Sequence, residues 1–513
     1  MASNVVVILI TIVLYLIMMV VVGVICSRKN EDVGDFYLGG RKLGPIVTAM
    51  SAEASDMSSY LLMGLPGLAY LCGAAEVSWT VIGLFVGTYL NWLLVAKRLR
   101  VYSTRCGAIT IPDFFARRYR DKKVIMAISA VIILIFFIPY TGSGFAACGK
   151  LFKSLFGADY HVAMIISAIV IILYTSIGGF LAASTTDLIQ SIVMTVALIV
   201  LVVYGVHSAG GVDNVIDNAR SIPQYLSLNS TTNVGTGEES SFGFLSIIST
   251  LAWGLGYFGM PHILLRFMAI DNKNSVKTSR RIASIWVIIS MAIAVFIGFI
   301  GNALSKQDFI KSLFASSSDA ETVVVKMADK MSESGVVAAV FAGLIFSGIL
   351  ACTMSTADSQ LLAASSSMSE NLMGGVFGMK LSDKQKMISA RLVLIVIAIL
   401  GVIIAWNPDS SIFRVVSFAW AGFGATFGPV MLAALFWKRS NKYGAIAGMA
   451  AGGIMVFVWK FGISKLGGAF AIYELLPAFV VAAVAIVVVS LATSAPEEEI
   501  TEEFEAVKTE LNV

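Results

Sequence analysis

Long apolar runs recur along the entire chain, separated by short polar segments. A helix of about 20 apolar residues crosses roughly 30 Å of hydrocarbon, and it leaves none of its backbone groups unpaired there. The pattern therefore predicts an all-α polytopic membrane protein whose 513 residues form one integral membrane domain. We expect about 13 transmembrane helices, near residues 4–26, 44–70, 75–96, 124–147, 161–184, 188–208, 243–265, 283–305, 336–366, 390–406, 413–437, 444–462 and 472–494.

The basic residues are concentrated in alternate connections between these helices. If the N-terminus lies outside, 26 of the 36 lysines and arginines fall in the inner segments, which are 27–43, 97–123, 266–282, 367–391, 438–443 and the tail. Inner loops of membrane proteins carry such an excess, so we expect the N-terminus outside and the C-terminus in the cytoplasm. The net charge of +4 then reflects topology, and it gives no reason to expect a nucleic-acid partner.

The composition also fits a protein embedded in a lipid bilayer, since 58% of the residues are hydrophobic, 13% are charged and the mean hydropathy is +0.86. The five cysteines are scattered and odd in number, which argues against a disulfide framework or a zinc site. No Walker A sequence is present, so we do not expect ATP bound to this chain to drive its work.

The second predicted span contains polar residues that hydrocarbon should penalise. It reads SAEASDMSSYLLMGLPG over 51–67 and carries Glu53, Asp56 and a Gly-x-Pro-Gly break. Unwound helices in transporters expose backbone groups that bind solutes, and an ionisable side chain inside a membrane indicates a functional site. The alternative is that the glycines and proline end the span at the outer surface, while the serines bond their own helix. Asp56 fits that alternative least, because its burial would have no compensation.

A second oxygen-rich stretch is FSGILACTMSTADSQLLAASSS over 346–367, with adjacent hydroxyls at Ser355 and Thr356 and an acid at Asp358. Hard cations prefer oxygen ligands, and hydroxyls with backbone carbonyls supply them without the excess charge of divalent sites. The stretch therefore indicates a sodium site. Helix packing through small hydroxyl residues is the alternative for either residue alone.

The seventh span begins with a third interrupted stretch, WGLGYFGMPHILLR over 253–266. Trp253 and Tyr257 are four residues apart and share a helical face, while Pro261 frees a carbonyl one turn earlier. An aromatic belt at the membrane interface is the alternative explanation of the two rings. Spans two and seven are both interrupted by glycine and proline and stand five helices apart, which is typical of two inverted five-helix repeats.

Two further acidic features have simpler explanations. Asp187, in LAASTTDLIQS, would cap the sixth span, because Ser, Thr and Asp before an apolar run satisfy free N–H groups. A cation station on the cytoplasmic side is the alternative role for this residue. The acidic tail APEEEITEEFEAVKTELNV is expected to be a solvated end.

Five motifs occur in the order found in one transporter family. The stretches LGGRKLGP, SAEASDMSSYLLMGLPG, WGLGYFGMPHILLRFMA, STADSQLLAASS and SFAWAGFGATFGP resemble the sodium/solute symporter family, in particular its proline-transporting members, over residues 30–480. The resemblance implies a leucine-transporter-type fold of five-plus-five inverted repeats with accessory helices. It also implies sodium-driven import of a small zwitterion, L-proline, by alternating access across a bacterial plasma membrane, with no enzymatic chemistry.

The resemblance also implies roles for individual residues, motif by motif. Its sodium ligands would be the carbonyls of Ala54, Met57 and Cys352 and the hydroxyls of Ser355 and Thr356. Its substrate site would use Asp56, Ser58, Ser59, Tyr60, Tyr140, Trp253, Tyr257 and Pro261. Asp187 would lie on the sodium exit path, and Arg41 would lie near the cytoplasmic gate.

The same resemblance implies six segments along the chain. They are an accessory helix with its inner loop (1–43), the first repeat (44–208), an extracellular loop (209–242), the second repeat (243–437), two accessory helices (438–494) and the cytoplasmic tail (495–513).

Some residues depart from the family pattern. Ser59 and Tyr60 stand where Gly-Trp is familiar, Glu53 stands where a glycine is expected, and Cys352 replaces an alanine. Ser59 and Tyr60 leave the identity of the substrate open. Another small amino acid or a carboxylate solute, carried with sodium or protons, is therefore an alternative. A substrate sensor or passive channel on the same fold is a further alternative.

Overall fold

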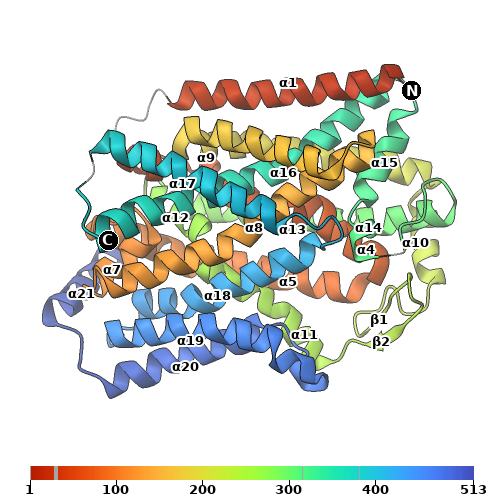
Figure 1. Ribbon diagram of the computed structural model, residues 1–513. Helices are drawn as coiled ribbons and strands as arrows, with labels where there is room; N and C mark the ends of the chain where they lie inside the picture. Colours follow the sequence, from red (N-terminus) through yellow and green to blue (C-terminus); the bar gives the residue numbers. More distant parts are fainter. Residues whose placement is uncertain (1, 28–32, 315, 381, 513) are drawn as a thin grey trace.

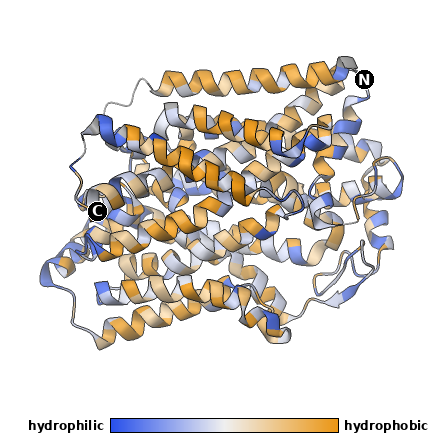
Figure 2. Ribbon diagram, viewed as in Figure 1, coloured by the Kyte–Doolittle hydropathy of each residue, from blue (hydrophilic) through white to orange (hydrophobic). Residues whose placement is uncertain are grey.

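The protein is a bundle of helices that run side by side (Figure 1). The computed structural model describes residues 2–27, 33–314, 316–380 and 382–512. The helices are hydrophobic along most of their length, and hydrophilic residues gather toward the two ends of the bundle (Figure 2). Among the described residues, 10 helices are long and apolar enough to cross a membrane, or 11 with one bent pair. The all-α membrane architecture is confirmed, and the count of 13 spans stays a prediction.

The first half of the chain is entirely helical apart from its connections. Its elements are α1 (Ala2–Ser27), α2 (Val33–Leu38), η1 (Gly39–Arg41), α3 (Pro45–Ser59), η2 (Tyr60–Gly64), α4 (Leu65–Cys72), α5 (Ala74–Leu90), η3 (Asn91–Ala96), α6 (Lys97–Arg105), α7 (Ile111–Arg118), α8 (Val124–Phe156), α9 (Tyr160–Ser208) and α10 (Val212–Ser221). The segments η2 and η3 are π-helical.

The second half begins with a small antiparallel hairpin of β1 (Ser230–Thr232) and β2 (Glu239–Ser241), in which Ser230 lies opposite Ser241. The remaining elements are α11 (Phe244–Leu251), η4 (Ala252–Gly259), α12 (Pro261–Ala269), α13 (Val276–Lys306), α14 (Ser317–Ala320), α15 (Val323–Ser332), α16 (Val336–Ser366), η5 (Ser367–Val376), α17 (Asp383–Ile404), α18 (Ile412–Phe436), α19 (Lys442–Phe461), η6 (Ile463–Leu466), η7 (Gly468–Phe470), α20 (Leu475–Ala492) and α21 (Glu498–Asn512).

The two ends of the bundle differ, and we call them the Arg41 face and the Lys150 face. The Arg41 face carries η1, α7, the end of α12 and α21. The Lys150 face carries the N-terminus, α10, the β1–β2 hairpin and α14. The N-terminus and the C-terminus lie at opposite ends, right and left in Figure 1.

Two spans are broken near their middle, and only the second breaks at its predicted glycine and proline. In the first, the helical geometry breaks inside α3 at Ser58, whose φ is 47° and ψ is −170°, and the chain continues through η2 into α4. The predicted Gly-x-Pro-Gly break at residues 64–67 is helical, so that position of the break is wrong. In the second, α11 and η4 meet α12 at an angle of 47°, with Pro261 as the first residue of α12. A break of this kind leaves backbone N–H and C=O groups without helical partners, so they are free to bind other groups.

The boundary between the predicted fifth and sixth spans is wrong by several residues. The sequence placed it at 185–187, but the helix α9 changes direction at Gly179, whose φ is 65°. Glycine adopts this left-handed conformation without the penalty that a Cβ atom imposes, so the break falls there. Asp187 consequently lies inside a helix and not at its start, and its predicted capping role is wrong.

Close packing in the centre of the bundle places the broken spans against their neighbours. Helix α16 packs against α1, α3, α8 and α9, and its middle turns are fully buried. Helix α5 meets η4 through Gly87 and Gly254, where a Cβ atom built on Gly87 would lie 2.3 Å from the Gly254 carbonyl oxygen. Small residues allow helix backbones to approach closely in membranes, and here they bring the second broken span into contact with α5.

The acidic C-terminus is a docked helix, so the expectation of a solvated tail is wrong. Helix α21 lies on the Arg41 face with Phe504 7% exposed and Val507 4% exposed. The Arg118 guanidinium lies over the Phe504 ring at 5.4 Å, and Lys438 pairs with Glu505 at 3.1 Å. The tail has an apolar stripe at helical spacing as well as its charges, and burial of that stripe holds it to the bundle.

Candidate functional site

Oxygen atoms from α3 and α16 converge at the break in the first span. The Ser355 hydroxyl donates to the Ala54 carbonyl at 2.8 Å and to the Cys352 carbonyl at 3.2 Å. The Thr356 hydroxyl donates to the same Cys352 carbonyl at 3.1 Å. Four of the five oxygens that the sequence proposes as sodium ligands are therefore neighbours. The fifth, the Met57 carbonyl, accepts from the Tyr60 backbone N–H.

This oxygen cluster has the chemistry of a monovalent cation site. It contains two hydroxyls and two carbonyls and no charged ligand, which suits a hard cation of single charge. Among the described residues, no three His, Cys, Asp or Glu side chains come together as metal ligands.

Asp56 lies in α3 directly before the break at Ser58, and its contacts link three spans. Its Oδ2 accepts a hydrogen bond from the Tyr257 hydroxyl of η4. Its backbone carbonyl accepts a weaker one from the Tyr140 hydroxyl of α8 at 3.4 Å. Asp56 is 6% exposed, so its carboxyl group is almost completely removed from water. Tyr257 holds the carboxyl group and Tyr140 holds the backbone of Asp56 at the point where α3, α8 and η4 meet.

A small cavity of about 20 Å³ opens beside Asp56. Its walls are formed by Asp56, Met57, Ser58, Tyr60, Leu84, Tyr140, Trp253, Met291, Val416 and Trp420. A space of this size holds about one water molecule. An amino acid can enter only if these side chains move apart, so the structure has a contracted binding cavity.

Aromatic rings separate this cavity from a larger one on the Lys150 face. The Trp253 ring lies 6.0 Å from Tyr60, 5.6 Å from Phe413 and 5.1 Å from Tyr473 between ring centroids. We call these four rings the aromatic plate. Beyond it lies a polar vestibule of about 590 Å³, whose lining includes Trp253 and the Lys460–Glu474 ion pair. Trp253 therefore contacts both the contracted cavity and the vestibule.

Three residues expected in the substrate site, Ser59, Tyr257 and Pro261, do not line the cavity. The Ser59 hydroxyl is buried and has no hydrogen-bond partner among the described residues. Pro261 begins α12, at the bend of the second broken span. The Tyr257 hydroxyl bonds the Asp56 carboxyl group, although Tyr257 does not line the cavity. None of the three residues forms part of the cavity wall.

Asp187 belongs to a buried ion pair that joins four helices. Its Oδ2 accepts from Arg266 of α12 at 3.1 Å and from the Ser51 hydroxyl of α3 at 2.6 Å. Arg266 also donates to the Ser359 hydroxyl of α16 at 2.5 Å. Asp187 and Arg266 are 0% and 1% exposed. The pair connects α9 to α3, α12 and α16 between the oxygen cluster and the Arg41 face.

Arg41 closes the bundle at the face that bears its name. Its guanidinium donates to the Ser103 hydroxyl at 3.0 Å and to the carbonyls of Met268 at 2.8 Å, Ser103 at 3.0 Å and Ala108 at 2.5 Å. Burial lowers the pKa of Arg41 to about 10, and nearby Arg100 adds to the shift. The guanidinium therefore remains charged at neutral pH and ties η1 to α6, α12 and the loop before α7.

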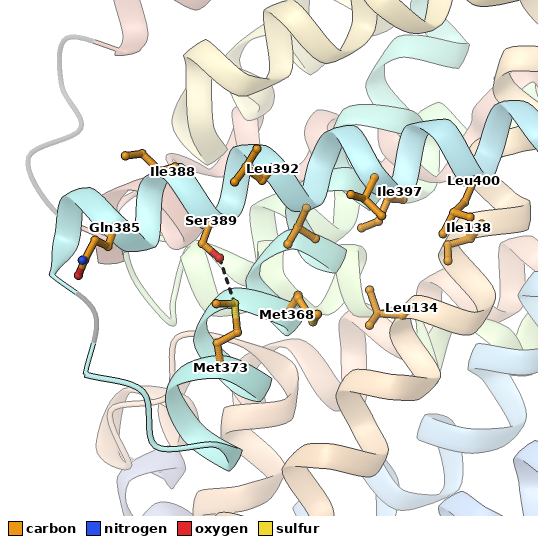
Figure 3. Close-up of a pocket in the computed structure, with 12 residues that line it drawn as sticks. Leu134, Ile138, Met368, Met373, Gln385, Ile388, Ser389, Leu392, Ile397 and Leu400 are labelled. Atoms are coloured by element: carbon orange, nitrogen blue, oxygen red, sulfur yellow. Dashed lines mark hydrogen bonds between the residues drawn. The ribbon is translucent and has the colours of Figure 1, made fainter.

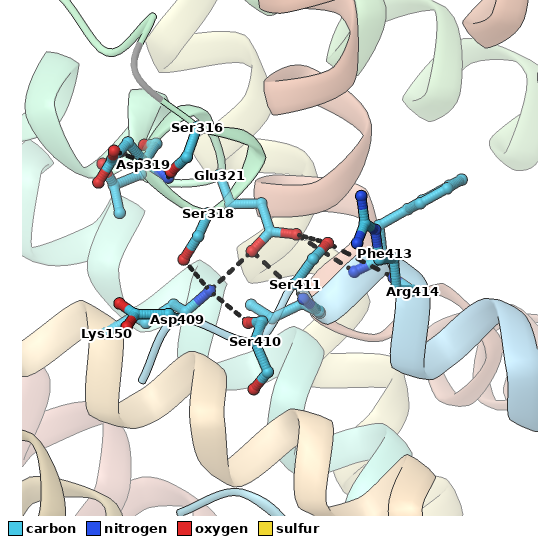
Figure 4. Close-up of polar contacts among 12 residues, drawn as sticks. Lys150, Ser316, Ser318, Asp319, Glu321, Asp409, Ser410, Ser411, Phe413 and Arg414 are labelled. Carbon is cyan, nitrogen blue, oxygen red and sulfur yellow. Dashed lines mark hydrogen bonds and ion pairs between the residues drawn. The ribbon is translucent and has the colours of Figure 1, made fainter. Parts of the chain in front are cut away.

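A second charged cluster closes part of the Lys150 face (Figure 4). The Lys150 ammonium of α8 lies 2.9 Å from Glu321 and donates to the Ser318 hydroxyl at 2.8 Å and the Ser410 carbonyl at 2.9 Å. Glu321 in turn accepts from the Ser411 hydroxyl at 2.9 Å and from backbone N–H groups at the start of α18. The cluster joins α8, the α14 segment and α18.

An apolar groove on the outside of the bundle has a different character (Figure 3). It lies between α8, η5 and α17, has a volume of about 470 Å³ and has no charged residue in its lining. Leu392 and Ile388, on its rim, are 58% and 48% exposed. Such walls suit lipid chains, and they offer nothing to orient a zwitterion. The groove is therefore not the substrate site.

Sequence reasoning missed several residues that shape the site. Trp420 lines the cavity, and its indole N–H donates to the Trp253 carbonyl at 2.8 Å. Its place in the glycine-rich stretch SFAWAGFGATFGP was a usable signal, because close packing between spans needs small neighbours. Leu84 and Met291 carried no signal, since an apolar residue in an apolar span has no distinguishing feature. Arg266 could have been found as the counter-ion that a buried Asp187 requires.

The fold and the site define a membrane transporter built around two broken helices. The sequence profile described as "Sodium:solute symporter family" matches residues 36–452. The chain belongs to the sodium:solute symporter family. It is consequently related to transporters and is a multi-pass membrane protein.

Two curated relatives resemble the chain over almost its full length. The "High-affinity proline transporter PutP" of Bacillus subtilis (strain 168) is 40% identical over 490 residues, which cover 95% of this chain and 98% of that protein. The "Sodium/proline symporter" of Escherichia coli (strain K12) is 42% identical over 498 residues, covering 97% and 95% of the two chains.

Solved structures confirm the leucine-transporter type of fold. A Na⁺-coupled sialic acid symporter in a substrate-bound outward-open state superimposes with a TM-score of 0.78 at 18% identity, covering 96% of this chain and 99% of that one. MhsT in complex with L-phenylalanine superimposes with a TM-score of 0.53 at 13% identity, covering 88% and 99%.

Proposed function

We propose that this chain is a sodium-coupled symporter that imports L-proline. The observation that carries the proposal is the convergence of the Ala54, Ser355 and Thr356 oxygens directly beside the Asp56 cavity. A cation and a small zwitterion bound this close together can stabilise each other electrostatically. The printed names of the two relatives, which carry proline, support the choice of substrate.

The proposed cycle uses the two broken spans. A sodium ion would replace the hydroxyl-to-carbonyl hydrogen bonds between Ser355 and Ala54, so that it holds α3 to α16. The substrate ammonium would face Asp56, and its carboxylate would meet free N–H groups at the break near Ser58. The proline ring would lie against Trp253 and the other aromatic walls. A rigid ring loses little conformational entropy on binding, which favours proline over flexible amino acids.

The sodium gradient is sufficient to drive uphill uptake. One sodium ion moving inward yields about 2.3 kcal/mol per 100 mV of membrane potential. A roughly tenfold concentration gradient adds about 1.4 kcal/mol. With one-to-one coupling, the sum of about 3.7 kcal/mol sustains an accumulation of a few hundredfold.

We also propose that residues 44–208 and 243–437 are inverted repeats and that the Arg41 face is cytoplasmic. Leu43, just before α3, bridges in parallel to Ile270, just after α12. The first broken span therefore starts at the face where the second broken span ends, as an inverted repeat requires. The excess of basic residues in segments of the Arg41 face supports the orientation.

The orientation is tested with single cysteines in a chain from which the five native cysteines have been removed. Lys122→Cys lies on the Arg41 face, and Glu238→Cys lies in the β1–β2 hairpin, both at exposed positions. We expect an impermeant thiol reagent added to intact cells to label Glu238→Cys only. Labelling of Lys122→Cys in sealed cells would reverse the orientation.

The transport activity is tested with purified protein in proteoliposomes under separately imposed sodium, potassium and proton gradients. We expect labelled proline to accumulate only with sodium, and unlabelled proline to compete better than alanine, glycine, betaine or sialic acid. Accumulation driven equally by potassium or protons, or stronger competition by another solute, would contradict the assignment.

Thr356→Ala tests the cation site within the same assay. The substitution removes the Thr356 hydroxyl oxygen from the proposed sodium ligands, which should weaken sodium binding by about 1.5–3 kcal/mol. The sodium concentration for half-maximal uptake should then rise roughly tenfold or more. Thr353→Ala is the matched control, because Thr353 is buried in the same helix and donates to the Ile349 carbonyl. An equal effect of both substitutions would assign Thr356 to helix packing.

A further inference from the structure

A second carboxyl group lies one helical turn before Asp56 and takes no part in the proposed cycle. Glu53 is 1% exposed, and its Oε1 accepts from the Trp92 indole N–H at 3.0 Å. Its Oε2 is buried and has no hydrogen-bond partner among the described residues. Glu53 does not line the Asp56 cavity, so a substrate ammonium bound in that cavity does not reach it.

Two more buried oxygens have no hydrogen-bond partner in the part of the chain that the structure describes. They are the Thr88 hydroxyl of α5 and the Asn91 amide oxygen of η3, and both residues are 1% exposed. Thr88, Asn91 and Trp92 are spaced three and four residues apart, so they share one helical face. Trp92 on that face reaches Glu53, and the Asn91 amide N–H donates to the Tyr257 carbonyl at 3.0 Å. The face therefore points at α3 and η4.

Asp56 of the first broken span belongs to the same group of polar residues. Glu53 and Asp56 are three residues apart and lie on one face of α3. The Tyr257 hydroxyl, which donates to Asp56, has Thr88 and Glu53 as its other close polar neighbours. Polar groups of α3, α5 and η3 therefore gather around Tyr257 of η4. A π-helical segment such as η3, which begins at Asn91, is frequent at functional sites.

The group holds two carboxyl groups and no basic side chain that pairs with them among the described residues. No ion pair involves Glu53 or Asp56 among the described residues, and Arg266, on neighbouring α12, is already paired with Asp187. Burying two carboxylates without a counter-charge costs several kcal/mol per ion, so a cation is required for both to be ionised. Several acceptor oxygens without donors are what a bound cation needs and what a hydrogen-bonded core avoids.

We propose that Glu53, Asp56, Thr88 and Asn91 form a second binding site for a monovalent cation of the size of sodium. The site is distinct from the Ala54–Cys352–Ser355–Thr356 cluster, since its ligands come from α3, α5 and η3 and none comes from α16. It goes beyond the proposed function, because it adds a cation whatever the transported solute is. A cation there neutralises the carboxyl pair and fixes α5 to the two broken spans.

The test counts bound sodium on the purified full-length protein by equilibrium binding of radioactive sodium. The wild type is expected to bind one ion at each cluster. Glu53→Gln keeps the size of the side chain and an acceptor for Trp92, and it should lose one of the two ions. Thr356→Ala should weaken binding of the other ion, and the double variant should keep only that weakened ion. Sodium binding by the wild type at a single site, or unchanged counts in Glu53→Gln, would overturn the proposal.

Two further variants separate a cation ligand from a general effect on folding. Thr88→Val keeps the shape of the side chain and removes its oxygen, so the second ion should bind about tenfold more weakly. Glu370→Gln changes a half-buried glutamate that pairs with Lys386 far along the chain, and the sodium count should stay at the wild-type value. Equal losses in Glu370→Gln and Glu53→Gln would contradict a specific site.

Stabilisation by the ion gives a second readout that does not depend on transport. A ligand that binds only the folded state raises its stability in proportion to the logarithm of ligand concentration. The sodium-dependent rise in melting temperature should be smaller in Glu53→Gln than in the wild type, and potassium in place of sodium tests the size preference. If proline uptake fails but the Glu53-dependent ion remains, the proposed substrate is wrong and the second site stands.

Discussion

The two faces of the bundle are closed by different chemistry. On the Arg41 face, one guanidinium donates four hydrogen bonds to α6, α12 and the loop before α7. On the Lys150 face, the aromatic plate separates the contracted cavity from the vestibule, and the Lys150–Glu321 pair holds α14 and α18 to α8. One closure depends on directed hydrogen bonds from a single side chain. The other depends on the packed area of several rings and on one buried ion pair.

The two faces should therefore open in different ways. Hydrogen bonds weaken steeply with distance and angle, so a small displacement of Arg41 breaks all four contacts together. Ring packing weakens in proportion to the area that is exposed, so the plate can open stepwise as single rings rotate. Trp253 lies in both cavities, which couples the state of the plate to the substrate site. Substitutions can therefore disturb one closure without the other.

The largest effect is expected at the ion pair of the Lys150 face. Lys150→Met leaves Glu321 buried without its cation, which should reduce the free energy of unfolding by about 3–5 kcal/mol. Equilibrium unfolding in mixed micelles measures the change. Lys153→Met is the control, because Lys153 is exposed one turn further along α8.

A double substitution distinguishes the ion pair from simple loss of packing. Lys150→Met combined with Glu321→Leu removes the buried charge, so it should cost less than Lys150→Met alone. A larger cost in the double variant would mean that the hydrogen bonds from Glu321 to the start of α18 dominate the cluster.

The second effect concerns the Arg41 face. Arg41→Lys keeps the positive charge and loses the planar guanidinium group. The closed state should therefore lose about 1.5–3 kcal/mol of stability, which raises the population of the open state roughly tenfold or more. The rate of thiol labelling at Thr48→Cys, a fully buried position near the start of α3, reports the opening. Arg105→Lys, on an exposed arginine of the same face, should leave the rate unchanged.

A smaller effect tests whether α21 belongs to the closure of the Arg41 face. Phe504→Ser removes the buried ring over which Arg118 lies, and it should destabilise docking of the helix by about 1–2 kcal/mol. Hydrogen exchange of the α21 amides should accelerate, while exchange in α14 and α18 stays unchanged. Glu502→Gln, at an exposed position of α21, is the control. Faster exchange on both faces would contradict independent closures.

The smallest effect should have the opposite sign. The Tyr60 hydroxyl is buried in the aromatic plate and has no hydrogen-bond partner among the described residues. Tyr60→Phe removes this unsatisfied group and should stabilise the fold by about 1 kcal/mol. Tyr473→Phe provides the contrast, because the Tyr473 hydroxyl donates to the Ser417 carbonyl at 2.7 Å and its loss should destabilise. If Tyr60→Phe and Tyr473→Phe changed the free energy of unfolding in the same direction, the distinction between an unsatisfied and a bonded hydroxyl would be wrong.

The sequence predicted the features that depend on local pattern. Apolar runs of sufficient length predicted the helices, and glycine with proline predicted the break in the second broken span, since these residues disrupt hydrogen bonding within their own segment. The break in the first span falls at Ser58 and not at its glycines and proline. The hydroxyls of Ser355 and Thr356 were found because polar groups are conspicuous in an apolar span. Their meeting with the Ala54 carbonyl was expected from family resemblance, and spacing alone did not give it.

The features that depend on contacts between distant segments were missed or wrong. Asp187 was assigned to a helix start because its local sequence resembles a cap, whereas its partner Arg266 lies 79 residues away. The tail was expected to be solvated because its charges outnumber its apolar residues, and its charged partners lie in other loops. The cavity wall formed by Leu84 and Met291 could not be distinguished from other apolar surface.

The contact of Gly87 with Gly254 sets the mechanical character of the joint between α5 and the second broken span. Side chains of packed helices normally interlock as ridges in grooves, and such interlocking resists sliding. At this joint the backbones themselves touch, so few interlocking side chains oppose a shift of η4 along α5. A single added methyl group at Gly87 would clash with the Gly254 carbonyl oxygen and force the two segments apart.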